Sequence, residues 1–133
     1  MEIKDYTSYE PAQIRQLYEA VGWVAYTKDM DALMRGYANS LLVLGAYENG
    51  ALIGILRAVG DGYTVVLVQD ILVLPEKQRQ GVGTALVKAA LASFPEVRQI
   101  QLTTDDRPET AAFYRSLGFS AFSDFGLCVF MRG

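Results

Sequence analysis

The stretch that decides the fold runs from Val65 to Phe94 and reads VVLVQDILVLPEKQRQGVGTALVKAALASF. Two apolar runs, separated by Gln69 and Asp70, lead into a polar loop that carries Gly81 and Gly83. Apolar residues then recur at helical spacing as far as the end of the stretch. The pattern therefore predicts a strand, a basic glycine-bearing loop and a helix.

The junction between this loop and its helix is a candidate anion site. The first turn of a helix exposes unpaired backbone N–H groups, and the positive end of its dipole carries roughly half a charge. Glycines let a ligand come close to the backbone, so the junction suits a phosphate or pyrophosphate. Glycines at such a junction are also common as plain caps or close-packing positions. The spacing fits neither the dinucleotide fingerprint, because Leu86 stands in the place of its third glycine, nor a Walker A loop.

Composition narrows the classes of protein that the chain can represent. Its 133 residues predict one domain over 1–133, and a net charge of -3 argues against a nucleic-acid partner. No apolar run approaches the roughly 18 residues that span a bilayer, so no membrane partner is expected. Cys128 is the only cysteine, which predicts a reducing, cytoplasmic location. With no histidine and one cysteine, no metal site is expected.

The remaining periodicities predict seven strands and four helices. The strands are expected at residues 3–6, 41–47, 51–59, 63–74, 97–103, 120–123 and 127–131. Helices are expected at residues 9–21, at 28–39 with Thr27 as cap, from the glycines to Phe94, and at 108–117. The segment with Trp23 and Tyr26 reads as a loop. This order predicts an α+β domain around a mixed, mostly antiparallel sheet.

Two spaced motifs carry a family resemblance. The first is Val73-x-Pro75-x-x-Gln78-Arg79-x-Gly81-x-Gly83, and the second, some thirty residues later, is Ala112-Phe113-Tyr114-x-x-x-Gly118-Phe119. Together they resemble the coenzyme loop and the tyrosine-bearing helix of the GNAT superfamily of acetyl-CoA-dependent N-acetyltransferases. The resemblance implies the GNAT fold, with about seven strands, four helices and splayed fourth and fifth strands. The splay would open between residues 71–73 and 100–103.

The resemblance also implies acetyl-CoA as co-substrate. Backbone N–H groups of the loop would cradle its pyrophosphate, with Arg79 or Lys77 near the 3′-phosphate. The edge of the preceding strand would pair with the pantetheine arm and donate an N–H to the thioester carbonyl. Arg107 stands where many members carry an asparagine that contacts the coenzyme. The coenzyme-binding set is then Ile71, Leu72, Val73, Gln78, Arg79, Gln80, Gly81, Val82, Gly83, Thr84 and Arg107.

Two residues are the catalytic candidates. The resemblance assigns Tyr114 as the general acid, because a phenol can share its proton with the departing thiolate. The competing interpretation is that Tyr114 only packs on its helix. Asp70 can act as general base, directly or through a water, or attract a cationic amine; alternatively, it ties down a neighbouring loop.

The acceptor site is expected among residues of the N-terminal helices. Candidates are Trp23, Tyr26, Tyr37 and the pair Asp29 and Asp31. The resemblance predicts an acyltransferase that moves acetyl to a primary amine, on a small molecule or a protein, by direct attack in a ternary complex. The alternative function is a non-catalytic acyl-CoA-binding sensor. Apolar strands near the C-terminus would permit a homodimer.

Overall fold

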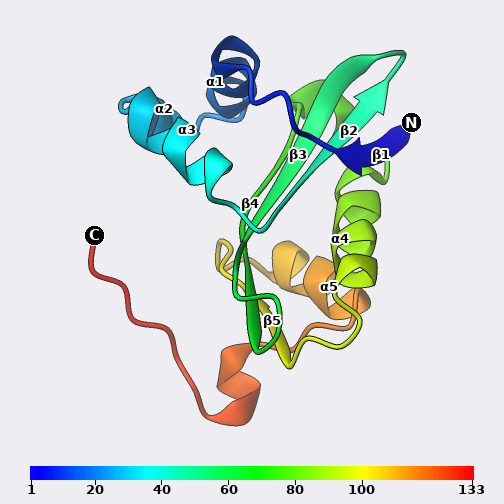
Figure 1. Ribbon diagram of the computed structural model, residues 1–133. Helices are drawn as coiled ribbons and strands as arrows, with labels where there is room; N and C mark the ends of the chain where they lie inside the picture. Colours follow the sequence, from blue (N-terminus) through cyan, green and yellow to red (C-terminus); the bar gives the residue numbers. More distant parts are fainter. The chain divides into compact units, whose positions relative to one another are not determined.

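A computed structural model describes residues 1–133, which form two compact units, Met1–Thr103 and Thr104–Gly133 (Figure 1). The first unit contains β1 (Glu2–Asp5), α1 (Pro11–Ala20), α2 (Val24–Thr27), α3 (Met30–Ala38), β2 (Leu42–Glu48), β3 (Ala51–Gly60), β4 (Val65–Val73), the 3-10 turn η1 (Pro75–Lys77), α4 (Val82–Ser93) and β5 (Gln99–Leu102). The second unit contains α5 (Pro108–Ser116) and the 3-10 turn η2 (Phe122–Phe125). That 1–133 acts as one domain stays a prediction.

The five strands form one sheet in the order β1-β2-β3-β4-β5. The first four strands are antiparallel, and β4 pairs with β5 in parallel. This arrangement confirms the predicted α+β class with a mixed sheet. The predicted seven strands are wrong in number, because residues 120–123 and 127–131 form no strands. Asp124 instead accepts the backbone N–H of Ala121, and Gly126 takes a left-handed conformation with φ of 72° that closes η2.

The helices also differ from the prediction in one place. Residues around Tyr26 were expected in a loop, but they form the short helix α2, so the chain has five helices. Asp29, and not Thr27, caps α3, because its carboxylate accepts the backbone N–H of Ala32 at 3.0 Å. The predicted cap, Thr27, instead ends α2.

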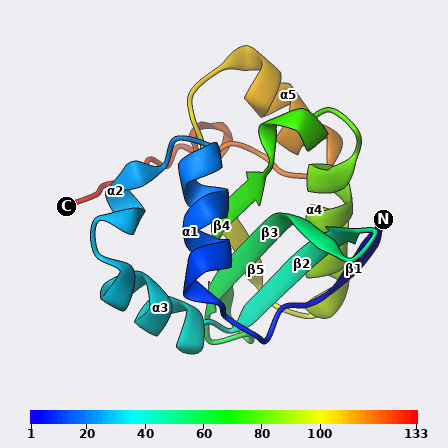
Figure 2. The ribbon, with the colours of Figure 1, turned by 90° about the horizontal axis from the view of Figure 1, so that it is seen from above.

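Two layers of helix cover the sheet of the first unit. α1 and α3 lie on one face and α4 lies on the other (Figure 2). The largest buried cluster belongs to the α1/α3 face and consists of Tyr6, Ile14, Leu17, Tyr18, Leu33, Tyr37, Val43, Ile55 and Leu72. On the other face α4 buries Val82, Leu86, Val87 and Ala90. A Cβ on Gly54 would lie 3.2 Å from Val82 and 3.4 Å from Leu86, so this glycine lets α4 approach the sheet closely.

A bulge divides β4 at Gln69. Ala58 pairs with Val68 and Arg57 pairs with Asp70, which leaves Gln69 as an extra residue. Neighbouring residues of a strand point to opposite faces, so Val68 and Asp70 also face opposite sides of the sheet. The bulge therefore turns Asp70 toward the α1/α3 face.

The separation of β4 from β5 begins just beyond this bulge. Pairing covers only Val65–Val68 of β4 against Gln99–Leu102 of β5, although β4 continues to Val73. The expected opening was wrong in detail, because Ile100 and Leu102 are still paired, with Val66 and Val68. The edge of β4 that β5 leaves uncovered thus starts at Gln69.

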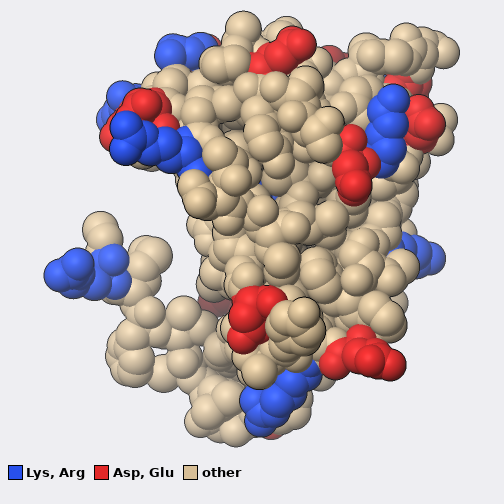
Figure 3. All heavy atoms as spheres, viewed as in Figure 1, with Lys and Arg blue, Asp and Glu red and all other residues tan.

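The charged surface has no dominant sign on the face that Figure 3 shows, where basic and acidic side chains are interspersed around a broad uncharged area. No helix has the length and apolar character needed to cross a bilayer. No group of three or more His, Cys, Asp or Glu side chains is placed to hold a metal ion.

Candidate functional site

The loop before α4 has an unusual backbone. Gln78 is extended, Arg79 has a φ of 62° and Gly81 has a φ of 85°. Left-handed φ values are rare for residues other than glycine, so Arg79 stores strain of order 1–3 kcal/mol at this position. A Cβ on Gly81 would touch nothing within 4 Å, so a larger side chain would fit there. Glycine is favoured at this position because of the positive φ. Alternation of left-handed and ordinary residues is the backbone pattern of anion-binding concavities.

Six consecutive N–H groups of this loop, those of residues 79–84, have no acceptor within the chain. The first helical bond of α4 runs from Ala85 N–H to Gly81 carbonyl oxygen at 3.0 Å, and no side chain caps the helix. The first turn of α4 also contains no acidic residue. The unpaired donors and the positive end of the α4 dipole make this loop, hereafter the cradle (residues 79–84), a candidate site for an anion.

Some side chains beside the cradle already have hydrogen-bond or ion-pair partners within the chain. Gln78 Nε2 donates to the carbonyl oxygen of Val73 at 3.1 Å, and Gln80 Nε2 donates to that of Glu76 at 3.1 Å. Lys77 forms an ion pair with Glu48, whose pKa is lowered by the hydrogen bond and charge of that lysine. Arg79 is exposed and joins none of the ion pairs of the chain, so its cation is free for a ligand.

The β4 edge beyond the bulge leads directly to the cradle. Ile71, Leu72 and Val73 pair with β3 on one side only, since β5 ends its pairing at Val68. An extended ligand arm can add to such an edge as a further strand. Edge and cradle belong to the same unit and are joined by η1, so one elongated molecule that ends in a phosphate can contact both.

Asp70 sits in a buried polar network on the other side of the bulge. It is 1% exposed, and its Oδ2 accepts from Arg57 Nε at 2.8 Å and from the Tyr18 hydroxyl at 2.8 Å. Arg57 is 8% exposed and also donates to Ser40 Oγ at 3.4 Å. The Asp70 Oδ1 atom is buried and has no hydrogen-bond partner. These contacts join Asp70 to β3 and α1 and not to a loop, and both roles that the sequence left open for Asp70 stay predictions.

Aromatic rings surround this network. The Tyr18 and Tyr37 hydroxyls lie 2.9 Å apart, and Arg57 stands over the Tyr37 ring at 5.2 Å. A Cβ on Gly36 would lie 3.1 Å from Arg57 Nη1, so this glycine of α3 makes room for the guanidinium. Burial alone would lower the pKa of Arg57, but the charge and hydrogen bond of Asp70 raise it overall.

Because Tyr18 and Tyr37 are buried, we expect the stability of the folded state to fall at alkaline pH. Burial, above all, raises the pKa of both Tyr18 and Tyr37 beyond the usual value of about 10. The folded state therefore keeps protons that the unfolded chain releases, and each tyrosine removes about 1.4 kcal/mol of stability per pH unit above pH ~10. We expect Tyr37→Phe to make the fall in urea midpoint between pH 9 and 11 shallower. Tyr63→Phe, at an 83% exposed tyrosine, should leave the fall in urea midpoint unchanged. An equally steep fall in wild type and in Tyr37→Phe would show that the buried Tyr37 does not contribute to the loss of stability at high pH.

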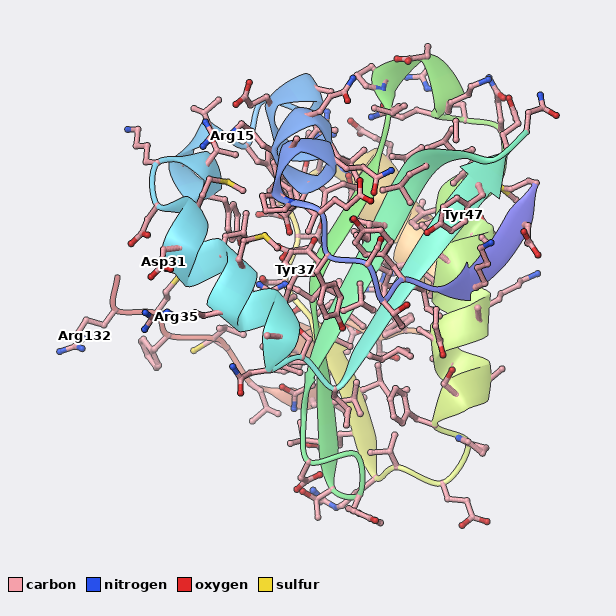
Figure 4. The ribbon with its side chains drawn as sticks, turned by 45° about the horizontal axis from the view of Figure 1, so that its top comes forward. Arg15, Asp31, Arg35, Tyr37, Tyr47 and Arg132 are labelled. Carbon is pink, nitrogen blue, oxygen red and sulfur yellow. The ribbon has the colours of Figure 1, made fainter.

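The structure brings two of the three aromatic acceptor candidates together. Trp23, which is 40% exposed, stacks on Tyr26 with ring centres 6.1 Å apart. The Tyr26 hydroxyl accepts from Gln69 Nε2 at 3.3 Å, and partial burial is the main cause that raises its pKa. Tyr37 is fully buried between α3 and the sheet (Figure 4), and its hydroxyl contacts the Tyr18 hydroxyl, so its role toward an acceptor stays a prediction.

The other two acceptor candidates have local partners. Asp29 caps α3. Asp31 pairs with Arg35 at 3.1 Å on the exposed side of that helix, and Figure 4 labels Asp31 and Arg35. An exposed pair of this kind contributes about 0–1 kcal/mol.

The second unit carries Tyr114 and Arg107. Tyr114 is half-buried on α5 and makes edge-to-face contacts with Phe113 at 4.9 Å and Phe119 at 5.9 Å. Burial raises the pKa of its phenol, and the Asp105 carboxylate adds to the rise. The Arg107 side chain pairs with Asp105 and with Glu109. The roles of Tyr114 and Arg107 toward a ligand stay predictions.

Three members of the buried network were not among the site residues predicted from the sequence: Tyr18, Arg57 and Ser40. A signal was present, because Arg57 is the only charge in the apolar run 51–59 and Asp70 is the only one in the run 63–74. Lone opposite charges in two strands joined by a short turn indicate a buried pair.

Comparisons with known proteins agree with this geometry. A family model described as an acetyltransferase (GNAT) domain matches residues 39–121. A GNAT family acetyltransferase from Streptococcus pneumoniae has a similar structure, with a TM-score of 0.90 and 37% identity over 98% of this chain and 96% of that chain. A GNAT acetyltransferase from Brucella melitensis, in complex with acetyl-CoA, has a TM-score of 0.70 and 27% identity over 91% of this chain and 83% of that chain.

Among curated proteins, the uncharacterized N-acetyltransferase ycf52 of Pyropia yezoensis is 23% identical over 111 residues. The match covers 80% of this chain and 63% of that protein. The chain thus spans less than two thirds of the length of this relative.

Proposed function

Because the chain belongs to the GNAT acetyltransferase family, we propose that it transfers the acetyl group of acetyl-CoA to a primary amine by direct attack in a ternary complex. The observation that carries this proposal is the row of six unpaired N–H groups at residues 79–84, next to an uncovered strand edge. The Brucella melitensis relative, crystallised with acetyl-CoA, supports the choice of ligand.

In this proposal, the pyrophosphate occupies the cradle and Arg79 supplies a cation beside it. The pantetheine arm pairs with the free edge of Ile71–Val73 as an added strand. One N–H of that edge donates to the thioester oxygen, where negative charge develops during attack. A single donor of this kind contributes roughly 3–4 kcal/mol in other acyl-transfer enzymes. Arg107 is proposed as a further coenzyme contact.

The reaction is a single displacement at the thioester carbon. The amine nitrogen attacks, the C–N bond forms as the C–S bond breaks, and the nitrogen gives up a proton to Asp70, the candidate base, or to water. The leaving sulfur takes the proton of the Tyr114 phenol, which water then reprotonates. Even an unperturbed phenol, with a pKa of about 10, is protonated at neutral pH, and burial raises the pKa of Tyr114 further, so it holds a proton to give. No covalent acyl-enzyme is involved, since the only thiol, Cys128, lies outside both motifs.

Replacing Tyr114 by phenylalanine is therefore expected to lower kcat by roughly tenfold to a thousandfold, with little change in the affinity for acetyl-CoA. Steady-state thiol release gives kcat, and calorimetry gives the affinity. Tyr63→Phe is the matched control, because Tyr63 is 83% exposed in the turn between β3 and β4. An unchanged kcat in Tyr114→Phe would remove this residue from the mechanism.

The acceptor binds, in this proposal, near the exposed ring of Trp23 and the half-buried ring of Tyr26, with buried Tyr37 behind them. Asp70, on the same side of the sheet, is retained as candidate base. The acceptor is a small-molecule amine or a protein amine. We propose the cytoplasm as the location of the reaction, because the single cysteine suits a reducing compartment.

A thiol-release screen tests the proposal, with acetyl-CoA as donor and a panel of alkyl amines, amino sugars, polyamines and lysine peptides as acceptors. Release that depends on one amine class supports the enzyme. Micromolar binding of acetyl-CoA without release for any amine would instead support a non-catalytic sensor. A chain that neither binds acetyl-CoA nor releases thiol would overturn both.

A further inference from the structure

Asp70, the candidate base, is too deeply buried to touch an acceptor amine directly. The residue is 1% exposed, and its two donors, Arg57 Nε and the Tyr18 hydroxyl, both bind the Oδ2 atom. The Oδ1 atom is buried as well, but it accepts no hydrogen bond. A buried carboxylate oxygen without a donor is costly, so its presence calls for a reason. Oδ1 is the oxygen of Asp70 that is free to take a proton.

The surroundings hold the carboxylate in this orientation. Arg57 stands over the Tyr37 ring at 5.2 Å and also donates to Ser40 Oγ at 3.4 Å. The Tyr18 hydroxyl lies 2.9 Å from the Tyr37 hydroxyl. Both donors of Oδ2 are thus fixed by partners on α3 or just after it, so Asp70 cannot turn its two oxygens around without breaking several contacts. A proton from outside the network therefore has to arrive at Oδ1.

Tyr26 of α2 connects this network with the surface. Its ring is partly buried, packs on the Tyr18 ring at 5.2 Å and stacks on the exposed Trp23 ring at 6.1 Å. Gln69, the neighbour of Asp70 in the bulge, donates through Nε2 to the Tyr26 hydroxyl at 3.3 Å. The Tyr26 oxygen therefore has a donor, while its own proton has no acceptor within the chain. A phenol with a free proton thus lies beside a carboxylate with a free oxygen.

We propose that Tyr26 is a catalytic residue that relays the proton of the attacking amine to Asp70 Oδ1, an inference that rests on the proposed function. As the C–N bond forms, the amine N–H gives its proton to the Tyr26 oxygen. At the same time the Tyr26 O–H gives its own proton to Oδ1. Tyr26 is a neutral phenol before and after the step, and Asp70 becomes a carboxylic acid. That acid returns its proton through the same phenol to water.

The ionisation of Tyr26 is consistent with a relay. Burial is the main cause that raises the pKa of Tyr26, and the charge of the Asp70 carboxylate adds to the rise. A raised pKa makes a free phenolate rarer, so Tyr26 is a poor base on its own. In the relay one proton leaves the phenol as another arrives, and no phenolate forms. The buried carboxylate supplies the basicity, and the phenol supplies the contact with the amine.

Removing only the Tyr26 hydroxyl tests the relay. Tyr26→Phe keeps the ring, so it should lower kcat by roughly tenfold to a thousandfold with little change in KM for the amine. Thiol release is measured with acetyl-CoA and the amine of the panel above that has the highest kcat. Tyr47→Phe is the matched control and should keep the wild-type kcat. Tyr47, labelled in Figure 4, is a partly buried tyrosine of β2 that packs against the same core cluster.

A double-mutant cycle shows whether Tyr26 acts through Asp70. The background is Asp70→Leu/Arg57→Met, which removes the buried ion pair as a whole. In this background the relay has no final acceptor, so adding Tyr26→Phe should change kcat by no more than about twofold. A residue that only packs against the acceptor would instead cost the same factor in both backgrounds. Circular dichroism of each variant checks that it is folded.

The outcomes separate the relay from the proposed function. An active wild type with an unchanged kcat in Tyr26→Phe, or with a change in KM alone, would overturn the relay and leave the acetyltransferase proposal standing. Independent, multiplying losses of kcat in the cycle would overturn it as well, and so would an unchanged kcat in Asp70→Leu/Arg57→Met. A wild type that releases no thiol with any amine would overturn the proposed function and the relay with it.

Discussion

Replacing Asp70 by leucine is expected to lower the free energy of unfolding by about 3–5 kcal/mol, because it leaves Arg57 buried without its counter-ion. The pair has its guanidinium and carboxylate 2.8 Å apart, with side chains 9% and 0% exposed. A domain of this size has a total stability of roughly 5–15 kcal/mol, so the loss removes a large share of it. Urea unfolding at pH 7 measures the change.

The exposed pair of Asp31 and Arg35 is the matched control. It has the same atoms in contact at 3.1 Å, but its side chains are 79% and 77% exposed. Asp31→Leu should therefore cost no more than about 1 kcal/mol. Equal losses of unfolding free energy for Asp70→Leu and Asp31→Leu would show that the buried pair of Asp70 and Arg57 is no more important for stability than an exposed pair.

The double variant Asp70→Leu/Arg57→Met separates stability from catalysis. Removing both charges together should recover most of the stability, because an apolar pair of similar volume needs no counter-ion. If Asp70 is the general base, this stable variant still loses kcat. If Asp70 only anchors the bulge, kcat stays within a few fold of wild type.

The second large effect concerns the cradle. Gly81→Val/Gly83→Val is expected to weaken acetyl-CoA binding at least a hundredfold in calorimetry. Gly81 has a φ of 85°, which a β-branched residue resists, so valine there re-aims the N–H groups around it. Losing two charge-assisted hydrogen bonds at about 1.5–3 kcal/mol each accounts for the size of the effect.

Two controls isolate binding from folding. Gly50→Val introduces the same conformational conflict at a φ of 81°, also with nothing within 4 Å of the new Cβ, but in the hairpin turn between β2 and β3. It should lose stability as Gly81→Val does and still bind acetyl-CoA. Gly83→Val alone should not destabilise α4, since glycine is the poorer helix former, yet it should weaken binding by blocking close approach. Retained micromolar binding in the double variant would make the glycines purely structural.

Local chemistry made much of the fold predictable. The Asn49-Gly50 turn, the alternation in β2 and β3, and the glycines before α4 each specify their structure within a few residues. The α+β class, the mixed sheet and the family followed from these elements and from the two motifs. The cradle residues were named from the same loop, although their contacts with acetyl-CoA stay predictions.

The remaining features depend on contacts that are distant in sequence. The bulge at Gln69 cannot be inferred from the burial pattern of β4. Residues 66, 68, 70 and 72 are all buried, as they would be in a strand without a bulge. Only the register against β3 shows that Val68 and Asp70 face opposite sides. The predicted hairpin at residues 120–131 failed because apolar composition marks a strand that needs a partner, and no partner exists within its own unit.

A crystal structure with coenzyme A bound would show whether the cradle holds the pyrophosphate. We expect pyrophosphate oxygens within about 3.2 Å of backbone nitrogens in residues 79–84, and the pantetheine arm along the edge of Ile71–Val73. Coenzyme A bound elsewhere on the molecule, with the cradle donors facing only solvent, would contradict this expectation.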